Sequence, residues 1–281
     1  MKNLTVIIVL GTLTPIAATA QTSKPCCKMS ATTEFAMLGK ADQFKSTHLS
    51  PAPLVFTPES GKMIKIHTPD GKEASAFVVM SKEKSDKYLL VFHEWWGLND
   101  HIKKESERLA YELGNVNVIA PDLYDGKVAT NSDEASRLMQ SLNEERAKSI
   151  VTGTINHAGS GSQIQTIGWC MGGGWSLQTA IMASAQGRGC VMYYGMPEND
   201  KVRLKKLNGP VLGIFATKDE WINNDVVTGF EENMNEIGKS VTVKWYEADH
   251  AFANPSNPQF EKEAADDAHQ LAVGFLQKNW K

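Results

Sequence analysis

The feature of this chain that most constrains its fold is the alternation of short apolar runs with helix-period segments after about residue 60. Short apolar runs bounded by turn residues are typical of strands covered on both faces, whereas apolar residues three and four apart indicate amphipathic helices. Their repeated alternation predicts an α/β fold: a mainly parallel sheet of about eight strands with helices on both faces. The predicted strands are Met63–His67, Ala74–Met80, Tyr88–His93, Val116–Ala120, Gln163–Gly168, Cys190–Gly195, Val211–Ala216 and Val241–Tyr246.

Helices are predicted between most of these strands. Pro69-Asp70-Gly71-Lys72 is a strong turn signal, so the first two strands should form an antiparallel hairpin. Ser132 is the predicted N-cap of the second helix. With no internal repeat and no linker in the sequence, we expect residues 61–281 to form one domain. The predicted helices are Asn99–Leu113, Ser132–Leu142, Glu144–His157, Gly173–Ala185, Asn224–Gly238 and Gln259–Gln277.

The first residues of the chain have the features of a signal peptide. Lys2 gives a positive start, Leu4 to Ala18 are almost entirely apolar or small, and Ala18-Thr19-Ala20 matches an A-x-A cleavage site. An N-terminal membrane anchor is the alternative, but the apolar run is shorter than the roughly 20 residues that span a bilayer. We therefore predict that residues 1–20 are removed, and that the protein is exported to the periplasm or secreted without a remaining membrane span.

Residues 21–60 are rich in Ser, Thr, Lys and Pro. This composition predicts a loosely structured lead-in, with a short helix near Phe35–Phe44. Loss of Lys2 with the signal changes the formal net charge from −3 to −4. The charges form no block of one sign, so nothing indicates binding to nucleic acid.

The chain contains four cysteines, at positions 26, 27, 170 and 190. That number is too small for the disulfide framework of a small stapled domain. Cys26 and Cys27 are adjacent and therefore awkward to pair with each other. They could bond another chain, bind a soft metal, or do neither.

The strongest local signal is Gly168-Trp169-Cys170-Met171-Gly172, between a predicted strand and a predicted helix. It fits the nucleophile-elbow pattern G-x-S-x-G with cysteine in the serine position. The glycines leave room for a strained turn, and the helix N-terminus lowers the pKa of the thiol. Taken alone, the pattern would fit a buried structural cysteine beside a glycine-rich helix start equally well.

Two further residues complete a catalytic order. Asp219 follows the strand Val211–Ala216, and His250 follows the strand Val241–Tyr246. Both therefore fall at the carboxyl ends of strands, where open α/β sheets build their sites, and in the order that α/β-hydrolases require. We expect His250 to take the Cys170 proton, Asp219 to orient and stabilise His250, and the Met171 amide to donate to the oxyanion.

The segment His93-Glu94-Trp95-Trp96-Gly97 begins like a zinc motif, but the position four residues after His93 is Gly97. The H-E-x-x-H pattern therefore fails, and no metal or cofactor is predicted.

Several of these segments together resemble the dienelactone hydrolase family. The run from Glu94 to Asn99 is similar to the family's first motif, Pro121-Asp122-Leu123-Tyr124 to its second, and Gly168 to Gly173 to its nucleophile motif. Asp219 and His250-Ala251-Phe252 match its acid and histidine positions. The resemblance covers about residues 60–280 and implies an α/β-hydrolase acting on esters or lactones.

The resemblance also implies roles at the site. Glu94 would contact the thiol and help to control its ionisation, and the Trp95 amide would be the second oxyanion donor. Family members that bind the dienelactone carboxylate carry arginines after the second motif and after the histidine; this chain has Lys127 and Asn254 in those regions. Lys127 could hold a carboxylate only as a point charge, which puts dienelactone itself in doubt.

The sequence therefore predicts an exported hydrolase of a small ester or lactone, acting through a thioester on Cys170. A thioesterase or acyltransferase would use the same triad. A non-catalytic exported binding protein and a thiol redox sensor are alternatives of other classes. The expected partner is a small-molecule ester or lactone substrate. The protein is expected to be a monomer or a small homo-oligomer.

Overall fold

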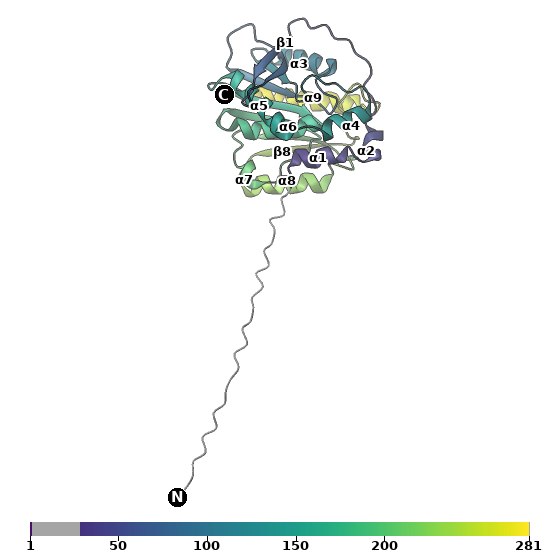
Figure 1. Cartoon of the computed structure of the whole chain (residues 1–281), viewed down its shortest axis with the longest axis vertical. Helices are drawn as coiled ribbons and strands as arrows, with labels where there is room; N and C mark the ends of the chain where they lie inside the picture. The colour runs from purple at the N-terminus through teal and green to yellow at the C-terminus, as the bar shows by residue number, and fades with distance from the viewer. Residues whose placement is uncertain (2–28, 281) are drawn as a thin grey trace.

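The computed structural model describes Met1 and residues 29–280, which build one mixed sheet with helices packed on both sides (Figure 1). The strands are β1 (Lys62–His67), β2 (Glu73–Val79), β3 (Lys87–Phe92), β4 (Asn117–Pro121), β5 (Gln163–Trp169), β6 (Gly187–Tyr193), β7 (Val211–Ala216) and β8 (Val241–Tyr246).

The strand order across the sheet is β1-β2-β4-β3-β5-β6-β7-β8. The pairs β1–β2 and β2–β4 are antiparallel, and every pair from β4–β3 to β7–β8 is parallel. The predicted α/β fold and its N-terminal hairpin are therefore confirmed. Because parallel strands end at the same edge of a sheet, the loops after β3, β5, β7 and β8 are brought together there.

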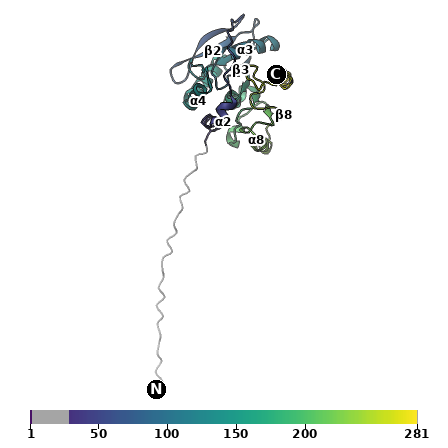
Figure 2. The same ribbon diagram turned by 90° about the vertical axis from the view of Figure 1, so that its right-hand side faces the viewer.

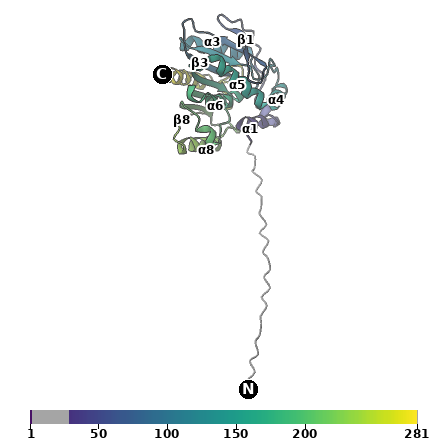
Figure 3. The same cartoon turned by 60° about the vertical axis from the view of Figure 1, so that its left-hand side comes forward.

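Helices cover the sheet in two layers (Figure 3). On one face, α3 (Asp100–Leu113) contacts α9 (Lys262–Lys278); on the other, α5 (Glu144–Ala158) contacts α6 (Met171–Ala183). Nearly every residue of α6 is buried, which explains why this helix has no polar face. The remaining helices outside the N-terminal segment are α4 (Ser132–Gln140), α7 (Lys201–Leu204), α8 (Asn224–Glu236) and the short 3-10 helix η1 (Ser184–Gln186).

Residues 31–47 contain the helical structure expected near Phe35–Phe44, but they are more ordered than the prediction of a loosely structured lead-in allows. They form two helices, α1 (Ala31–Leu38) and α2 (Asp42–Thr47), which contact α4 and, through α1, also α6 (Figure 1). Phe35 and Phe44 are buried, and Ser30 caps α1 by accepting a hydrogen bond from the Thr33 amide. Burial of these two aromatic side chains stabilises the folded segment more than its polar composition disfavours it.

A smaller correction concerns the start of α4. Its N-cap is Asn131 rather than Ser132, because the Asn131 side chain accepts a hydrogen bond from the Glu134 amide while Ser132 is already helical. The predicted signal peptide (apart from Met1), Cys26 and Cys27 lie outside the described residues. Among the helices of the described part of the chain, none combines the length and apolar character needed to cross a membrane.

Candidate active site

Cys170 lies on a strained turn between β5 and α6. Its backbone adopts φ 57° and ψ −123°, a conformation that a side-chain-bearing residue rarely takes, and it occupies the N-cap position of α6. Its amide donates to the Tyr193 carbonyl at 3.0 Å, which ties the turn to the neighbouring strand β6. The predicted strand–cysteine–helix arrangement is therefore present.

The flanking glycines are required by close backbone approach. A Cβ at Gly168 would lie 2.1 Å from the Gly172 carbonyl oxygen, and one at Gly172 would lie 2.3 Å from the Phe92 carbonyl oxygen. Both distances are far shorter than van der Waals contact, so any side chain would push α6 away from β5 or β3. The spacing of glycines around Cys170 thus reflects the packing of the turn itself.

Asp219 and His250 form a buried pair beside this turn. His250 Nδ1 lies 2.6 Å from Asp219 Oδ2, and the other carboxylate oxygen, Oδ1, accepts hydrogen bonds from the Trp221 and Ile222 amides. Burial raises the pKa of Asp219, but the interactions with His250 and the two amides lower it by more. The carboxylate is therefore ionised and fixed in orientation.

His250 in turn faces the thiol. A ring nitrogen of His250 and Cys170 Sγ lie within 4.8 Å of each other. Since Nδ1 is bonded to Asp219, the nitrogen available to the thiol is Nε2, which has no hydrogen-bond partner within the described residues. Burial lowers the pKa of His250, and the Asp219 carboxylate raises it by more. The sequence-predicted Cys170, Asp219 and His250 are thus gathered at one place.

The thiol itself is almost fully buried, with 1% of Cys170 exposed. Burial raises the pKa of this thiol, and the negative charge of Glu94 adds to the increase, while His250 and the Met171 amide lower it. The net effect is an increase, so the resting thiol is neutral near pH 7.

Glu94 follows β3 and is buried, and its carboxylate is hydrogen-bonded to Asn254. Its Oε2 accepts from Asn254 Nδ2 at 2.6 Å, and no hydrogen bond joins it to Cys170 in the part of the chain that is described. Burial raises the pKa of Glu94 to about 7, against smaller lowering effects of His250 and Asn254. Glu94 therefore acts on the thiol through its charge rather than by a direct hydrogen bond.

The two predicted oxyanion donors are the amides of Met171, next to Cys170 in the chain, and of Trp95, in the loop after β3. The Met171 amide interacts with Cys170, and the Trp95 amide donates to no acceptor among the described residues. The Trp95 ring is fully buried. Lys127, by contrast, is exposed and lines neither of the two cavities described for the structure.

His93, the first residue of the rejected zinc pattern, has a structural role. One ring nitrogen contacts the Glu94 carbonyl oxygen at 2.6 Å and the other accepts from the Leu123 amide at 3.2 Å. Both nitrogens are used to join the loop after β3 to the loop after β4.

Sequence reasoning missed the contribution of the N-terminal segment. His48 is buried with its ring centroid 4.9 Å from that of His250. Phe44 packs against the rings of His48 and Trp95, with centroid distances of 4.1 and 5.4 Å. Phe44 and His48 are four residues apart and so share one helical face. That spacing was the only signal, and it is too common to identify a site.

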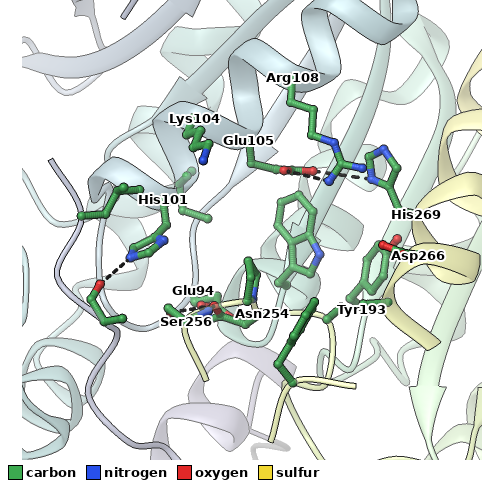
Figure 4. Close-up of a pocket in the computed structure, with 18 residues that line it drawn as sticks. Glu94, His101, Lys104, Glu105, Arg108, Tyr193, Asn254, Ser256, Asp266 and His269 are labelled. Atoms are coloured by element: carbon green, nitrogen blue, oxygen red, sulfur yellow. Dashed lines mark hydrogen bonds and ion pairs between the residues drawn. The ribbon is translucent and has the colours of Figure 1, made fainter. Parts of the chain in front are cut away.

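A cavity of about 480 Å³ lies next to the site, between α3, α9 and the loop after β8 (Figure 4). Glu94 and Asn254 form one end of it in this view, and Glu105, Arg108 and His269 lie toward the other end. Cys170 does not line this cavity. Glu94 is therefore shared between the nucleophile's surroundings and the cavity.

Comparison with known proteins agrees with this geometry. The model of the dienelactone hydrolase family matches residues 74–280. Protein usf of Aquifex pyrophilus is 32% identical over 203 residues, which are 68% of this chain and 87% of that protein. A carboxymethylenebutenolidase of Pseudomonas sp. strain P51 is 26% identical over 208 residues, 68% of this chain and 84% of that protein.

A similar fold is found among solved structures. The crystal structure of P91, a dienelactone hydrolase-like promiscuous phosphotriesterase from metagenomic libraries, superposes with a TM-score of 0.69 at 17% identity. The superposition covers 79% of this chain and 100% of P91. At that identity the likeness concerns the fold alone.

Proposed function

The chain belongs to the dienelactone hydrolase family of ester and lactone hydrolases, and from this premise we propose that Cys170, His250 and Asp219 form its catalytic triad. The observation that supports the triad most directly is the buried Asp219–His250 hydrogen bond of 2.6 Å beside a cysteine held on a strained turn. The features of residues 1–20 support export as part of the same proposal.

The first half of the reaction forms a thioester. His250 Nε2 removes the Cys170 proton as Sγ attacks the carbonyl carbon of the substrate, and Asp219 stabilises the imidazolium that results. The Met171 and Trp95 amides donate to the oxyanion of the tetrahedral intermediate. The C–O bond then breaks as His250 delivers its proton to the leaving alcohol oxygen; a lactone opens at the same bond.

The second half releases the acid. His250 accepts a proton from water, whose oxygen attacks the thioester carbon, and the C–S bond breaks as the sulfur regains a proton. A thioester substrate would give the same acyl-enzyme with a thiol as the leaving group, as in a thioesterase, and a thiol or alcohol acceptor in place of water would give acyl transfer. Ester and lactone substrates are preferred because the chain belongs to the dienelactone hydrolase family.

Glu94 has a separate task in this proposal. Its charge disfavours the thiolate, so the nucleophile remains a neutral thiol between turnovers and is protected from oxidation. The thiolate then forms only when a bound substrate and His250 are in place.

The decisive experiment is intact-mass spectrometry of the reduced protein mixed with p-nitrophenyl acetate. We expect nitrophenol release together with an acetyl adduct that is lost in Cys170→Ala and retained in Cys190→Ala. Cys190 is a matched control because it is equally buried but lies within hydrogen-bond distance of Ser176 away from His250.

Three other results would point elsewhere. Release without a Cys170 adduct would contradict the nucleophile. A reversible peroxide adduct without ester turnover would favour the redox sensor. Neither release nor adduct across a panel of esters and lactones would favour a non-catalytic binding protein.

A further inference from the structure

Three groups able to bind a metal ion meet at the nucleophile. One ring nitrogen of His48, one of His250 and Cys170 Sγ all lie within 4.8 Å of one another, and all three residues are buried. We propose that His48, Cys170 and His250 form a binding site for one borderline-soft divalent cation of the Zn²⁺ class, and that the ion holds the nucleophile inactive. The inhibition part of this inference rests on the proposed triad; the binding part does not.

The tautomer of His48 follows from its hydrogen bond. His48 Nδ1 lies 2.6 Å from the Phe44 carbonyl oxygen, and a carbonyl can only accept, so Nδ1 carries the proton. The ring is neutral, because burial lowers the pKa of His48 to about 3. Its Nε2 therefore presents a lone pair, and no partner for this atom exists among the described residues.

His250 turns Nε2, the nitrogen that Asp219 does not hold, toward the thiol. Burial lowers the pKa of this ring and the Asp219 carboxylate raises it by more, so a bound cation would displace a proton from Nε2 and release it to solvent. Asp219 fixes Nδ1, and Nε2 is again buried without a partner. A histidine whose second nitrogen is held by a carboxylate or a backbone carbonyl is the usual form of a metal-ligating histidine. Both histidines meet this condition, one through Asp219 and the other through Phe44.

The Nε2 atoms of His48 and His250 are both buried without a hydrogen-bond partner among the described residues. Buried polar atoms without partners are rare and call for a physical explanation. A single cation would accept electron pairs from both nitrogens and from the sulfur at once. It would also lie near the Asp219 and Glu94 carboxylates, which offset its charge.

The donor set determines the class of ion. One thiolate and two imidazoles suit Zn²⁺ or Cu⁺, and do not suit Mg²⁺ or Ca²⁺. Three protein ligands leave the fourth coordination position of a tetrahedral zinc ion open. This arrangement is typical of catalytic zinc sites, whereas structural sites have four protein ligands. Bond lengths of about 2.0–2.3 Å place tetrahedral ligand atoms roughly 3.3–3.5 Å apart. The donor atoms, which lie within 4.8 Å of one another, must therefore approach by up to roughly 1.5 Å. Binding forms the metal–sulfur bond and releases the thiol proton to solvent.

Co²⁺ is the probe for binding, since a thiolate ligand gives it a charge-transfer absorption. The experiment uses reduced, chelator-treated protein in which Cys26 and Cys27 are replaced by serine, so that their thiols cannot contribute. We expect a band that saturates at one equivalent of Co²⁺ and disappears on addition of Zn²⁺. His48→Phe, which keeps a ring against Phe44 and Trp95, and Cys170→Ala should each abolish it.

His157→Ala is the matched control, because His157 is an exposed histidine near the end of α5. Circular dichroism checks that each variant is folded. No saturable band, or a band that survives in His48→Phe, would overturn the inference.

Activity separates this inference from the proposed function. Equimolar Zn²⁺ should suppress p-nitrophenyl acetate hydrolysis and a chelator should restore it, whereas His48→Phe should need at least about tenfold more Zn²⁺. Hydrolysis without metal binding would refute the metal site and leave the triad standing. Metal binding that requires His48 and Cys170, in a protein that hydrolyses no ester after chelator treatment, would support the metal site and refute the proposed triad.

Discussion

His250 is the residue through which the rest of the triad acts. It is held by Asp219 on one nitrogen and faces Cys170 with the other. Removing either reacting group ends covalent catalysis, whereas removing the carboxylate charge leaves a misoriented but usable base. Cys170→Ala and His250→Ala should lower kcat on the order of 10⁶-fold, and Asp219→Asn on the order of 10⁴-fold. Assays with p-nitrophenyl acetate measure this order. An active His250→Ala variant, or a loss in Asp219→Asn as large as that in Cys170→Ala, would contradict it.

Glu94 makes the stability of the fold depend on pH. Its pKa rises from 4.5 to about 7 on folding because the carboxyl is buried. The folded protein therefore holds the proton more tightly than the unfolded chain, and stability falls as pH rises from about 4.5 to 7. The slope from this group is up to about 1.4 kcal/mol per pH unit.

Glu94→Gln removes that dependence while keeping the shape of the side chain. Urea unfolding at several pH values should show the wild-type free energy of unfolding declining relative to the variant across this range. Parallel curves for the two proteins would show that Glu94 is solvated as an ordinary surface carboxylate, contrary to its burial.

At the scale of single elements, the contact between α6 and the sheet depends on the absence of a side chain at position 172. A Cβ at Gly172 would lie 2.3 Å from the Phe92 carbonyl oxygen, an atom that cannot move without disturbing β3. Gly172→Ala should therefore destabilise the fold by several kcal/mol and abolish ester hydrolysis. The prediction fails if the variant keeps wild-type activity.

Gly229 in α8 is the matched comparison. A Cβ built there meets nothing within 4 Å, and its φ lies outside the positive range. Gly229→Ala should stabilise the protein by about 0.5–1 kcal/mol through helix propensity and reduced freedom of the unfolded chain. Thermal unfolding should therefore give a melting temperature below that of the wild type for Gly172→Ala and above it for Gly229→Ala.

Phe44 of the N-terminal helix α2 packs against the rings of Trp95 and His250, and the thiol is only 1% exposed. In Figure 2, α2 lies close to α4, with which it makes contacts. It is a single short helix without a side-chain N-cap, and Phe44 is its buried anchor. Local opening of such a weakly stabilised element is the expected route for substrate to reach Cys170.

Phe44→Ala should therefore speed modification of Cys170 by a bulky thiol reagent, at a stability cost of about 3–5 kcal/mol. The control is Phe56→Ala, because Phe56 lies in the same N-terminal region, is half-buried and contacts no residue of the triad. Unchanged modification rates in Phe44→Ala would mean that substrate enters by another path, such as the cavity beside Glu94.

At the scale of the whole molecule, the features that could be predicted from the sequence are those that short local patterns determine. The strands, the elbow and the carboxyl-end positions of Asp219 and His250 each follow from a short run of residues and the rules of parallel sheets. His48 and Asn254 could not be predicted, since each acts through a partner more than a hundred residues away in the chain. For the same reason, polar composition misrepresented residues 31–47, where a few aromatic contacts decide the structure.

One side chain connects several of these distant parts. Arg146 of α5 pairs with Asp70 in the β1–β2 turn at 3.0 Å and with Asp125 after β4 at 2.6 Å, and donates to the Glu73 carbonyl. Only 12% of the Arg146 side chain is exposed, so its removal leaves acceptors without a partner in a half-buried place. Arg146→Met should cost about 2–3 kcal/mol.

Lys148 on the same helix provides the contrast. It pairs with Glu144 and Glu145 at 2.9 Å, but its side chain is 34% exposed and that of Glu145 is 84% exposed. Such pairs contribute roughly 0–1 kcal/mol, so Lys148→Met should change the free energy of unfolding little. Urea unfolding of both variants decides the matter. If Arg146→Met unfolds like Lys148→Met, the turn, α5 and the loop after β4 are held together by apolar packing, and the network around Arg146 is incidental.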